Sequence, residues 1–284
     1  RTGGGEVSAA PFGIKEKYML LEVSNLDISY GEHPIVHDVS LKLDAGKVIA
    51  IVGESGSGKT TVIRAILGCL PNEGHVTNGK IVFDGKNLLE NTAEEWRQVS
   101  GKDITMVFQA SGSMLDPIQK IGKQFVEYIR QHVEVTEEDA YQQAIAMLKR
   151  MNLPNPETIM DSFPFELSGG MNQRVGVAMG MFFSPRILLA DEPTSALDVT
   201  TQAQVVEEMM GICRDDGTAI IIVTHNLGVA AYMADEIIVM RNGHIVERGT
   251  SDEIVNNPKE DYTKELLDAV PQIGGRAHDI YEAG

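Results

Sequence analysis

The chain has 284 residues, with 24 basic and 41 acidic side chains and a net charge of −17. This length suffices for one large α/β domain with an inserted subdomain, and the acidic balance argues against a nucleic-acid surface, which draws on clustered Lys and Arg. No stretch approaches 18 consecutive apolar residues and no signal peptide is evident, so we expect any membrane role to depend on a partner. Cys69 and Cys213 lie far apart in apolar surroundings, which predicts two buried thiols in a reducing compartment.

The N-terminal part is expected to contain a tail and a β-hairpin. Residues 1–18 include three consecutive glycines and are set aside as a tail with little fixed structure. Apolar and polar residues alternate over residues 19–30 and again over 35–43, across a turn at residues 31–34, which predicts a hairpin leading into a core strand at Val48. Tyr30 ends the first strand, where its ring either stacks on a purine or is an ordinary strand-end tyrosine.

Residues 53–60, GESGSGKT, match the phosphate-binding pattern G-x-x-x-x-G-K-[ST] between an apolar strand and a helix-like stretch. The glycines let the backbone form a nest of N–H groups around phosphate oxygens, and the following helix adds its dipole. Lys59 is expected to reach the β and γ phosphates and Thr60 to place its hydroxyl on Mg²⁺. The first ligand to expect is therefore a nucleoside triphosphate. The residues expected to bind it here are Gly53, Ser55, Gly56, Ser57, Gly58, Lys59, Thr60 and Thr61.

A strand, a short helix and another strand are expected after this loop, over residues 79–85, 92–99 and 104–109. The last strand ends in Gln109, which is followed by Ala-Ser-Gly-Ser at residues 110–113. Such a flexible run is well placed to couple a nucleotide-sensing side chain to movement of the next segment. By position alone, Gln109 is equally an ordinary surface residue.

The next segment changes character and is interpreted as a helical subdomain, residues 113–182, inserted into the α/β domain. Residues 118–130 and 137–151 carry apolar residues at helical spacing, and Pro154, Pro156 and Pro164 then break the pattern. The segment includes Ser168-Gly169-Gly170, which opens a helix. This turn is either a second anion-binding helix N-terminus or an ordinary capped start.

A buried-type strand over residues 186–191 ends in two adjacent carboxylates, Asp191 and Glu192. Neighbours on a strand point to opposite sides, so the pair need not share one task. We expect Asp191 to hold Mg²⁺ and Glu192 to polarise the attacking water as a general base. A helix over 200–213 and a strand over 219–223 follow, and His225 comes at the carboxyl edge of the sheet, where it is either a chemical or a structural residue.

Together these motifs resemble the ATP-binding subunit of ATP-binding-cassette (ABC) transporters. The phosphate loop, Gln109, residues 167–174, 187–192 and 195–198, and His225 follow the family's order and approximate spacing, over about residues 19–270. The resemblance implies an α/β P-loop NTPase core with an N-terminal antiparallel β subdomain and an inserted α-helical subdomain. It also implies specific roles: Tyr30 stacks on adenine, Gln109 contacts Mg²⁺ and the membrane partner, His225 senses the γ-phosphate, and Ser168, Gly169 and Gly170 bind the γ-phosphate of an opposing subunit.

Residues 163–171, 193–204 and 262–267 look like the oligopeptide, dipeptide and nickel importer ATPases, which are bacterial subunits on the cytoplasmic face of the membrane. That resemblance implies permease subunits, an extracytoplasmic binding protein, and a dimer with a second copy or with a related ATPase. Asn172 stands where this group often has Arg. Many members carry a cysteine-bearing C-terminal segment that looks like an iron–sulfur site; no cysteine follows Cys213, so we expect no cluster. Residues 271–284 are expected to be a tail.

The sequence therefore predicts an ATPase, using ATP and Mg²⁺, that powers import of peptides, nickel or a metallophore. Two nucleotides would lie between the subunits of a head-to-tail dimer, each between one subunit's phosphate loop and the other's Ser168 helix start. Two alternatives share this chemistry: a soluble ABC ATPase that clamps a cytosolic or nucleic-acid partner, and the ATPase of an exporter. The acidic charge and the importer-like segments favour import.

Overall fold

The computed structural model describes residues 19–109, 114–195 and 197–269. The strands are β1 (Met19–Tyr30), β2 (His33–Asp44), β3 (Val48–Val52), β4 (Gly74–Phe83), β5 (Lys86–Asn87), β6 (Ile104–Val107), β7 (Ile187–Asp191), β8 (Ala219–Thr224), β9 (Glu236–Arg241) and β10 (His244–Thr250). The helices are α1 (Lys59–Ile66), α2 (Ala93–Val99), α3 (Ile121–His132), α4 (Glu137–Arg150), α5 (Pro156–Asp161), α6 (Gly169–Met181), α7 (Val199–Asp216), α8 (Leu227–Met233), α9 (Ser251–Asn256) and α10 (Asp261–Asp268).

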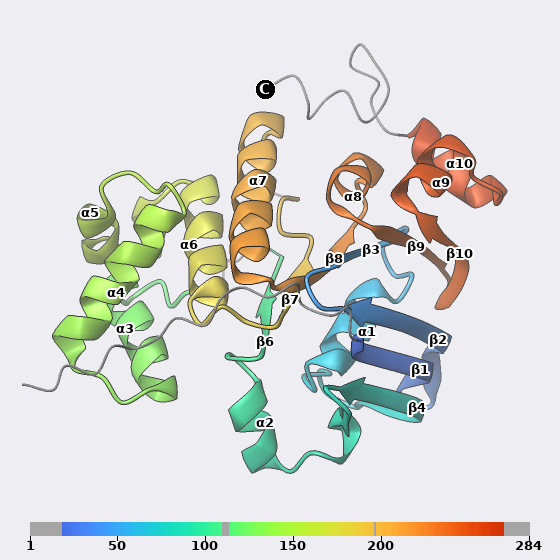
Figure 1. Ribbon diagram of the computed structural model, residues 1–284, viewed down its shortest axis with the longest axis horizontal. Helices are drawn as coiled ribbons and strands as arrows, with labels where there is room; N and C mark the ends of the chain where they lie inside the picture. Colours follow the sequence, from blue (N-terminus) through green and yellow to red (C-terminus); the bar gives the residue numbers. More distant parts are fainter. Residues whose placement is uncertain (1–18, 110–113, 196, 270–284) are drawn as a thin grey trace, which may run out of the picture.

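The smaller sheet is antiparallel, in the order β2-β1-β4-β5, and it contains the predicted hairpin (Figure 1). The hairpin turn is shorter than expected, because His33 already pairs with Tyr30. Strand β4 begins at Gly74, earlier than the predicted residue 79. Its register against β1 shifts between the pairs Ser24–Lys80 and Asp27–Asn78, so the glycine at 79 marks an irregularity within a strand rather than a strand start.

The larger sheet has the order β10-β9-β3-β8-β7-β6, and every pairing within it is parallel except β9–β10. All five residues of β3 are buried, and their side chains alternate between two cores. Val48, Ala50 and Val52 pack in the core that includes the helical region, whereas Ile49 and Ile51 pack toward α1 and the small sheet. The predicted strands at 48, 104, 186 and 219 are confirmed, except that β6 ends at Val107 and Gln109 lies just beyond it; their carboxyl ends meet at one sheet edge.

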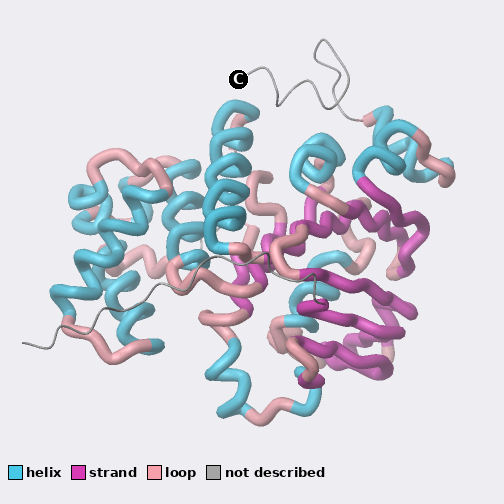
Figure 2. Tube along the Cα trace, in the orientation of Figure 1, coloured by secondary structure: helices cyan, strands magenta, loops and turns pink. Residues whose placement is uncertain are grey.

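Helices α3 to α6 lie together on one side of the molecule, away from the small sheet (Figures 1 and 2). One expectation here was wrong in detail, and one was incomplete. Helix α3 begins at Ile121 rather than 118, because Asp116 starts a turn that the Gln124 side chain holds at 2.8 Å, and Ile118 is 82% exposed. Pro156 and Pro164 do not merely break structure: each opens a short helix, where the missing proline N–H has no helical partner to lose.

The two cysteines differ in burial. Cys213 on α7 is buried, as predicted, but Cys69 is exposed, which corrects the expectation of two buried thiols. Cys69 lies in the turn that ends α1, where its N–H donates to the Arg64 carbonyl at 2.9 Å, so apolar neighbours in sequence do not cover it. Within the described ranges, no helix is long and apolar enough to cross a membrane. The proposed tails and residues 110–113 lie outside those ranges, and the limits of the helical subdomain stay a prediction.

Candidate functional site

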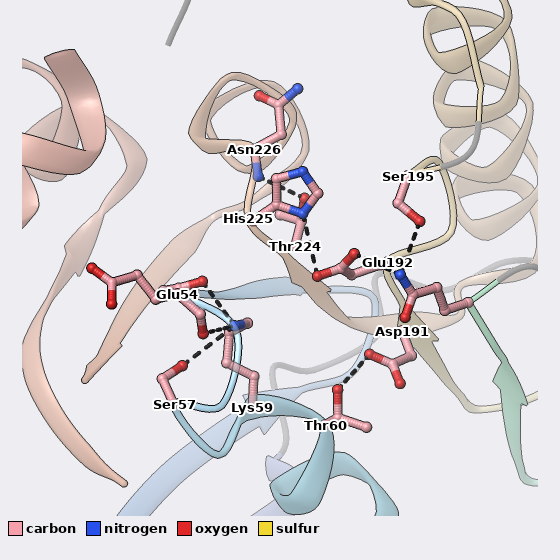
Figure 3. A network of polar contacts seen from close by, with 12 residues as sticks. Glu54, Ser57, Lys59, Thr60, Asp191, Glu192, Ser195, Thr224, His225 and Asn226 are labelled. Atoms are coloured by element: carbon pink, nitrogen blue, oxygen red, sulfur yellow. Dashed lines mark hydrogen bonds and ion pairs between the residues drawn. The ribbon is translucent and has the colours of Figure 1, made fainter. Parts of the chain in front are cut away.

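The phosphate loop connects β3 to α1 and folds around the Lys59 side chain (Figure 3). Gly53 has φ +150°, and a Cβ there would collide with the Met240 carbonyl, so the loop lies directly against the end of β9. Lys59 is 5% exposed, and its Nζ donates to the carbonyls of Gly53 at 2.8 Å and Glu54 at 2.6 Å. Burial lowers the pKa of Lys59, while the nearby carboxylates oppose that shift. The loop thus holds the Lys59 ammonium group by its carbonyls, and the positive charge at this place is suited to an anion.

Thr60, at the start of α1, meets Asp191 at the end of β7. The Thr60 hydroxyl donates to Oδ1 of Asp191 at 2.8 Å, and Asp191 is 4% exposed. Burial raises the pKa of Asp191, and the Thr60 hydrogen bond opposes the rise. A buried carboxylate beside a hydroxyl offers the hard oxygen donors that Mg²⁺ prefers, so the residues fit that ion. No group of three or more His, Cys, Asp and Glu side chains that could hold a metal occurs among the described residues, so such an ion would also need ligands such as phosphate oxygens.

Glu192 points away from Asp191, toward a different set of partners (Figure 3). Its Oε1 lies 3.2 Å from Nδ1 of His225, and its Oε2 accepts a hydrogen bond from Nε2 of Gln109 at 3.1 Å. Gln109 also donates to the Ser195 hydroxyl at 3.4 Å. The Glu192 backbone has φ +45°, and its N–H donates to the Val223 carbonyl of β8 at 2.8 Å. A carboxylate held on two sides yet 16% exposed can accept a proton from water.

Most of these groups line one cleft of about 550 Å³. Asp191 is not in its lining, but its hydrogen-bond partner Thr60 is. Most of the residues expected from the sequence meet there: Tyr30, Ser55, Gly56, Gly58, Lys59, Thr60, Thr61, Gln109, Glu192 and His225. Gly53 and Ser57 lie behind this lining, in the loop backbone. Ile35 also lines the cleft and was not foreseen, because nothing in its strand pattern distinguishes it.

Ser168, Gly169 and Gly170 are not part of this cleft. They lie at the start of α6, where the Ser168 hydroxyl caps the helix by accepting from the Met171 N–H at 3.2 Å. Ser168 and Gly169 are exposed, and a Cβ on Gly169 would meet open space. The start of α6 therefore does not contribute to the chain's own cleft, and anion binding there stays a prediction.

Sequence reasoning missed two residues behind the phosphate loop. The Tyr262 hydroxyl of α10 accepts a hydrogen bond from the Glu54 N–H at 2.9 Å, and the Gly243 N–H donates to the Ser57 carbonyl at 3.1 Å. Tyr262 belongs to a segment noted for resemblance alone, and the β9–β10 turn that carries Gly243 was not predicted. No local pattern signals either contact.

Comparisons with known proteins agree with this geometry. The family model described as ABC transporter matches residues 36–195. The oligopeptide transport ATP-binding protein OppD of Bacillus subtilis is 44% identical over 89% of this chain and 72% of that protein. The dipeptide transport ATP-binding protein DppD of Lactococcus lactis is 39% identical over 89% of this chain and 74% of that protein. A solved dimeric ATP-binding cassette in a post-hydrolysis state, bound to ADP and Pi, matches with a TM-score of 0.72 at 27% identity, over 82% of this chain and 99% of that one. The predicted fold class is confirmed, and the chain belongs to the ABC transporter family as its ATP-binding, ATP-hydrolysing cassette.

Proposed function

We propose that the chain powers import of peptides by a bacterial-type ABC transporter, docked on permease subunits at the cytoplasmic face of the membrane. The observation that carries the proposal is the convergence of Lys59, the Thr60–Asp191 pair and Glu192 around one cleft. The transport names of the relatives at 44% and 39% identity favour peptides over the nickel or metallophore cargo that the sequence left open.

In this proposal the cleft binds ATP through its phosphates. Backbone N–H groups of the loop and the Lys59 ammonium receive the β and γ phosphates, and the Tyr30 ring stacks on adenine. Thr60, Asp191 and Gln109 would hold Mg²⁺, which supplies charge neutralisation for the phosphate oxygens. The contact between the Asp191 carboxylate and the Thr60 hydroxyl supports this role, because it brings two of the proposed oxygen ligands together.

Hydrolysis then depends on Glu192 as the general base. A water molecule attacks the γ-phosphorus, its oxygen forms the new bond, and the bond to the β–γ bridging oxygen breaks to release ADP. Glu192 accepts the proton from that water, while His225 and Gln109 hold the carboxylate from either side at 3.2 and 3.1 Å. His225 also lines the cleft, which supports its role as sensor of the γ-phosphate.

The exposed start of α6 supports a dimer. Ser168, Gly169 and Gly170 lie off the chain's own cleft, so they are free to bind the γ-phosphate held by another subunit. ATP that touches both subunits favours a closed head-to-tail dimer, and loss of the γ-phosphate reopens it. Both halves of such a site are present in this chain, so the partner is either a second copy or a related ATPase.

An apolar groove of about 260 Å³ supports docking of a permease. It is lined in part by Phe108, Met114, Leu115 and Met179, and Phe108 directly precedes Gln109. Met114 is 59% exposed. A permease segment in this groove would move with the segment after β6 that carries Gln109, which links the nucleotide to the membrane partner.

The test is an affinity pull-down from detergent-solubilised membranes of the source cells, with mass spectrometry of the proteins recovered. We expect two permeases, with or without a related ATPase. Met114→Lys should lose them while the isolated chain keeps its ATPase activity. Leu89→Lys, a matched change at an apolar side chain 39% exposed on another surface, should recover them. Recovery of only soluble or nucleic-acid partners by the wild type would refute transport.

A further inference from the structure

The phosphate loop is held from behind by the C-terminal part of the described chain. Glu54 and Tyr262 lie 208 residues apart in sequence, yet the Glu54 N–H donates to the Tyr262 hydroxyl at 2.9 Å. The Gly243 N–H donates to the Ser57 carbonyl at 3.1 Å. Neither Tyr262 nor Gly243 lines the nucleotide cleft. The back of the loop therefore rests on β9, the β9–β10 turn and α10.

Tyr262 is itself firmly placed. Its side chain is 5% exposed, and the guanidinium of Arg241 stacks 4.5 Å from its ring centroid. The start of α10 is fixed by the Glu247 carboxylate of β10, which accepts from the N–H groups of Lys259 at 2.7 Å and Glu260 at 3.2 Å. Burial raises the pKa of Tyr262 above its usual range, so the phenol stays protonated at neutral pH. The hydroxyl is thus a fixed acceptor for the loop.

The peptide between Gly53 and Glu54 connects the Tyr262 hydroxyl to the Lys59 side chain. A trans peptide points its N–H and its carbonyl in opposite directions. The Glu54 N–H faces outward to Tyr262, so the Gly53 carbonyl of the same peptide faces inward, where it accepts from Lys59 Nζ at 2.8 Å. The Glu54 carbonyl also accepts from Nζ, at 2.6 Å. One phenol therefore sets the orientation of a peptide that holds the phosphate-binding ammonium.

We propose that Tyr262 is a positioning residue for ATP binding, whose hydroxyl locks the Gly53–Glu54 peptide and, through it, Lys59. This inference rests on the proposed function, because it assigns Tyr262 to the same ATP site. Tyr262 acts on nucleotide affinity and leaves the groups around the attacking water, Glu192 and His225, in place. Tight nucleotide binding by the phosphate loop thereby requires that α10, which is far from the loop in sequence, packs against it.

The test is Tyr262→Phe, which keeps the ring under Arg241 and removes only the hydroxyl. We expect the Kd for MgATP, measured by titration calorimetry, to rise about tenfold, which is about 1.4 kcal/mol. This lies within the range for leaving a part-buried N–H without its acceptor. KM should rise by a similar factor and kcat should change less than about twofold, because the loop binds the ground state and the transition state alike.

A matched control is Tyr128→Phe on α3, which removes another hydroxyl bonded to the backbone, at 2.8 Å from the Gly101 carbonyl. It should leave the Kd for MgATP unchanged. Amide hydrogen exchange measured without nucleotide adds a direct readout. The Glu54 N–H should exchange at least about tenfold faster in Tyr262→Phe but not in Tyr128→Phe, because the hydrogen bond to the Tyr262 hydroxyl protects it from exchange.

Three outcomes would overturn the inference: an unchanged Kd in Tyr262→Phe, an equal loss of affinity in Tyr128→Phe, or a fall in kcat with KM unchanged. A wild-type chain that binds no ATP would refute the proposed function itself, and the inference with it. If instead the wild type binds ATP and Tyr262→Phe binds it equally well, only the inference fails and the proposed function stands.

Discussion

We predict that Glu192→Gln separates ATP binding from hydrolysis. The amide keeps the length of the side chain and an oxygen that can accept from Gln109 Nε2, now 3.1 Å from Glu192, but it cannot take a proton from water at neutral pH. A positioned general base contributes about 10²–10⁴-fold to the rate. We expect kcat to fall at least about 100-fold, or about 2.7 kcal/mol in the barrier, while the Kd for MgATP stays within about threefold.

Phosphate release under saturating MgATP measures kcat, and calorimetry measures the Kd. Size-exclusion chromatography with ATP should show the variant trapped as a dimer, because ATP that is not hydrolysed keeps both subunits bridged. Glu127→Gln is the control: it removes the same charge on the exposed face of α3, 3.8 Å from Lys123, and should keep wild-type kcat. A kcat for Glu192→Gln within tenfold of wild type would show that another group activates the water.

Three further predictions concern the loop, a half-buried ion pair and acid stability. Lys59→Met should weaken MgATP binding by about 2 kcal/mol, which is the scale of a hydrogen bond to a charged group. If calorimetry gives wild-type affinity for this variant, Lys59 is excluded as a phosphate ligand. Arg174→Ala should lower the free energy of unfolding by about 2 kcal/mol and Tm by about 4–8 °C, because it leaves the half-buried Glu208 without the ion pair now formed at 2.7 Å; a melt shifted by less than 2 °C would contradict this. Hydrogen bonds from Lys86 and then Thr92 lower the pKa of Glu95 to about 2, so its stabilisation is present above its ordinary pKa of 4.5 and is lost as pH falls toward 2. Between pH 5 and pH 3, Tm should therefore fall further in the wild type than in Glu95→Gln, and parallel curves would exclude this role.

The elements that could be predicted from sequence are those whose signal is local. The phosphate loop has a fixed spacing between a strand and a helix, and the strands at 48, 104, 186 and 219 are short apolar runs bounded by turns. Because parallel strands share a carboxyl edge, the convergence of Lys59, Asp191 and Glu192 follows from topology once the strands are known.

The remainder depends on contacts between distant segments. The Tyr262–Glu54 hydrogen bond has no local signature, because a tyrosine in a short amphipathic helix looks the same whether its hydroxyl meets water or a loop 208 residues away. Cys69 sits among apolar neighbours and Ile118 fits an apolar helical spacing, yet a helix end exposes Cys69 and a turn exposes Ile118. Burial at such positions is decided by where the chain turns, which apolar content alone does not encode.

At Glu192 the left-handed backbone lowers the stability of the fold, whereas the proposed hydrolysis needs the carboxylate of this residue. Most other non-glycine residues of the described chain with positive φ are Asn or Asp, whose short polar side chains tolerate that region, whereas Glu192 has φ +45° without this advantage. Glycine there would relieve about 1 kcal/mol of backbone strain and delete the carboxylate at the same time. If Glu192 has the proposed role, a library screened for thermal resistance alone would enrich Glu192→Gly and, with it, a cassette that binds ATP without hydrolysing it.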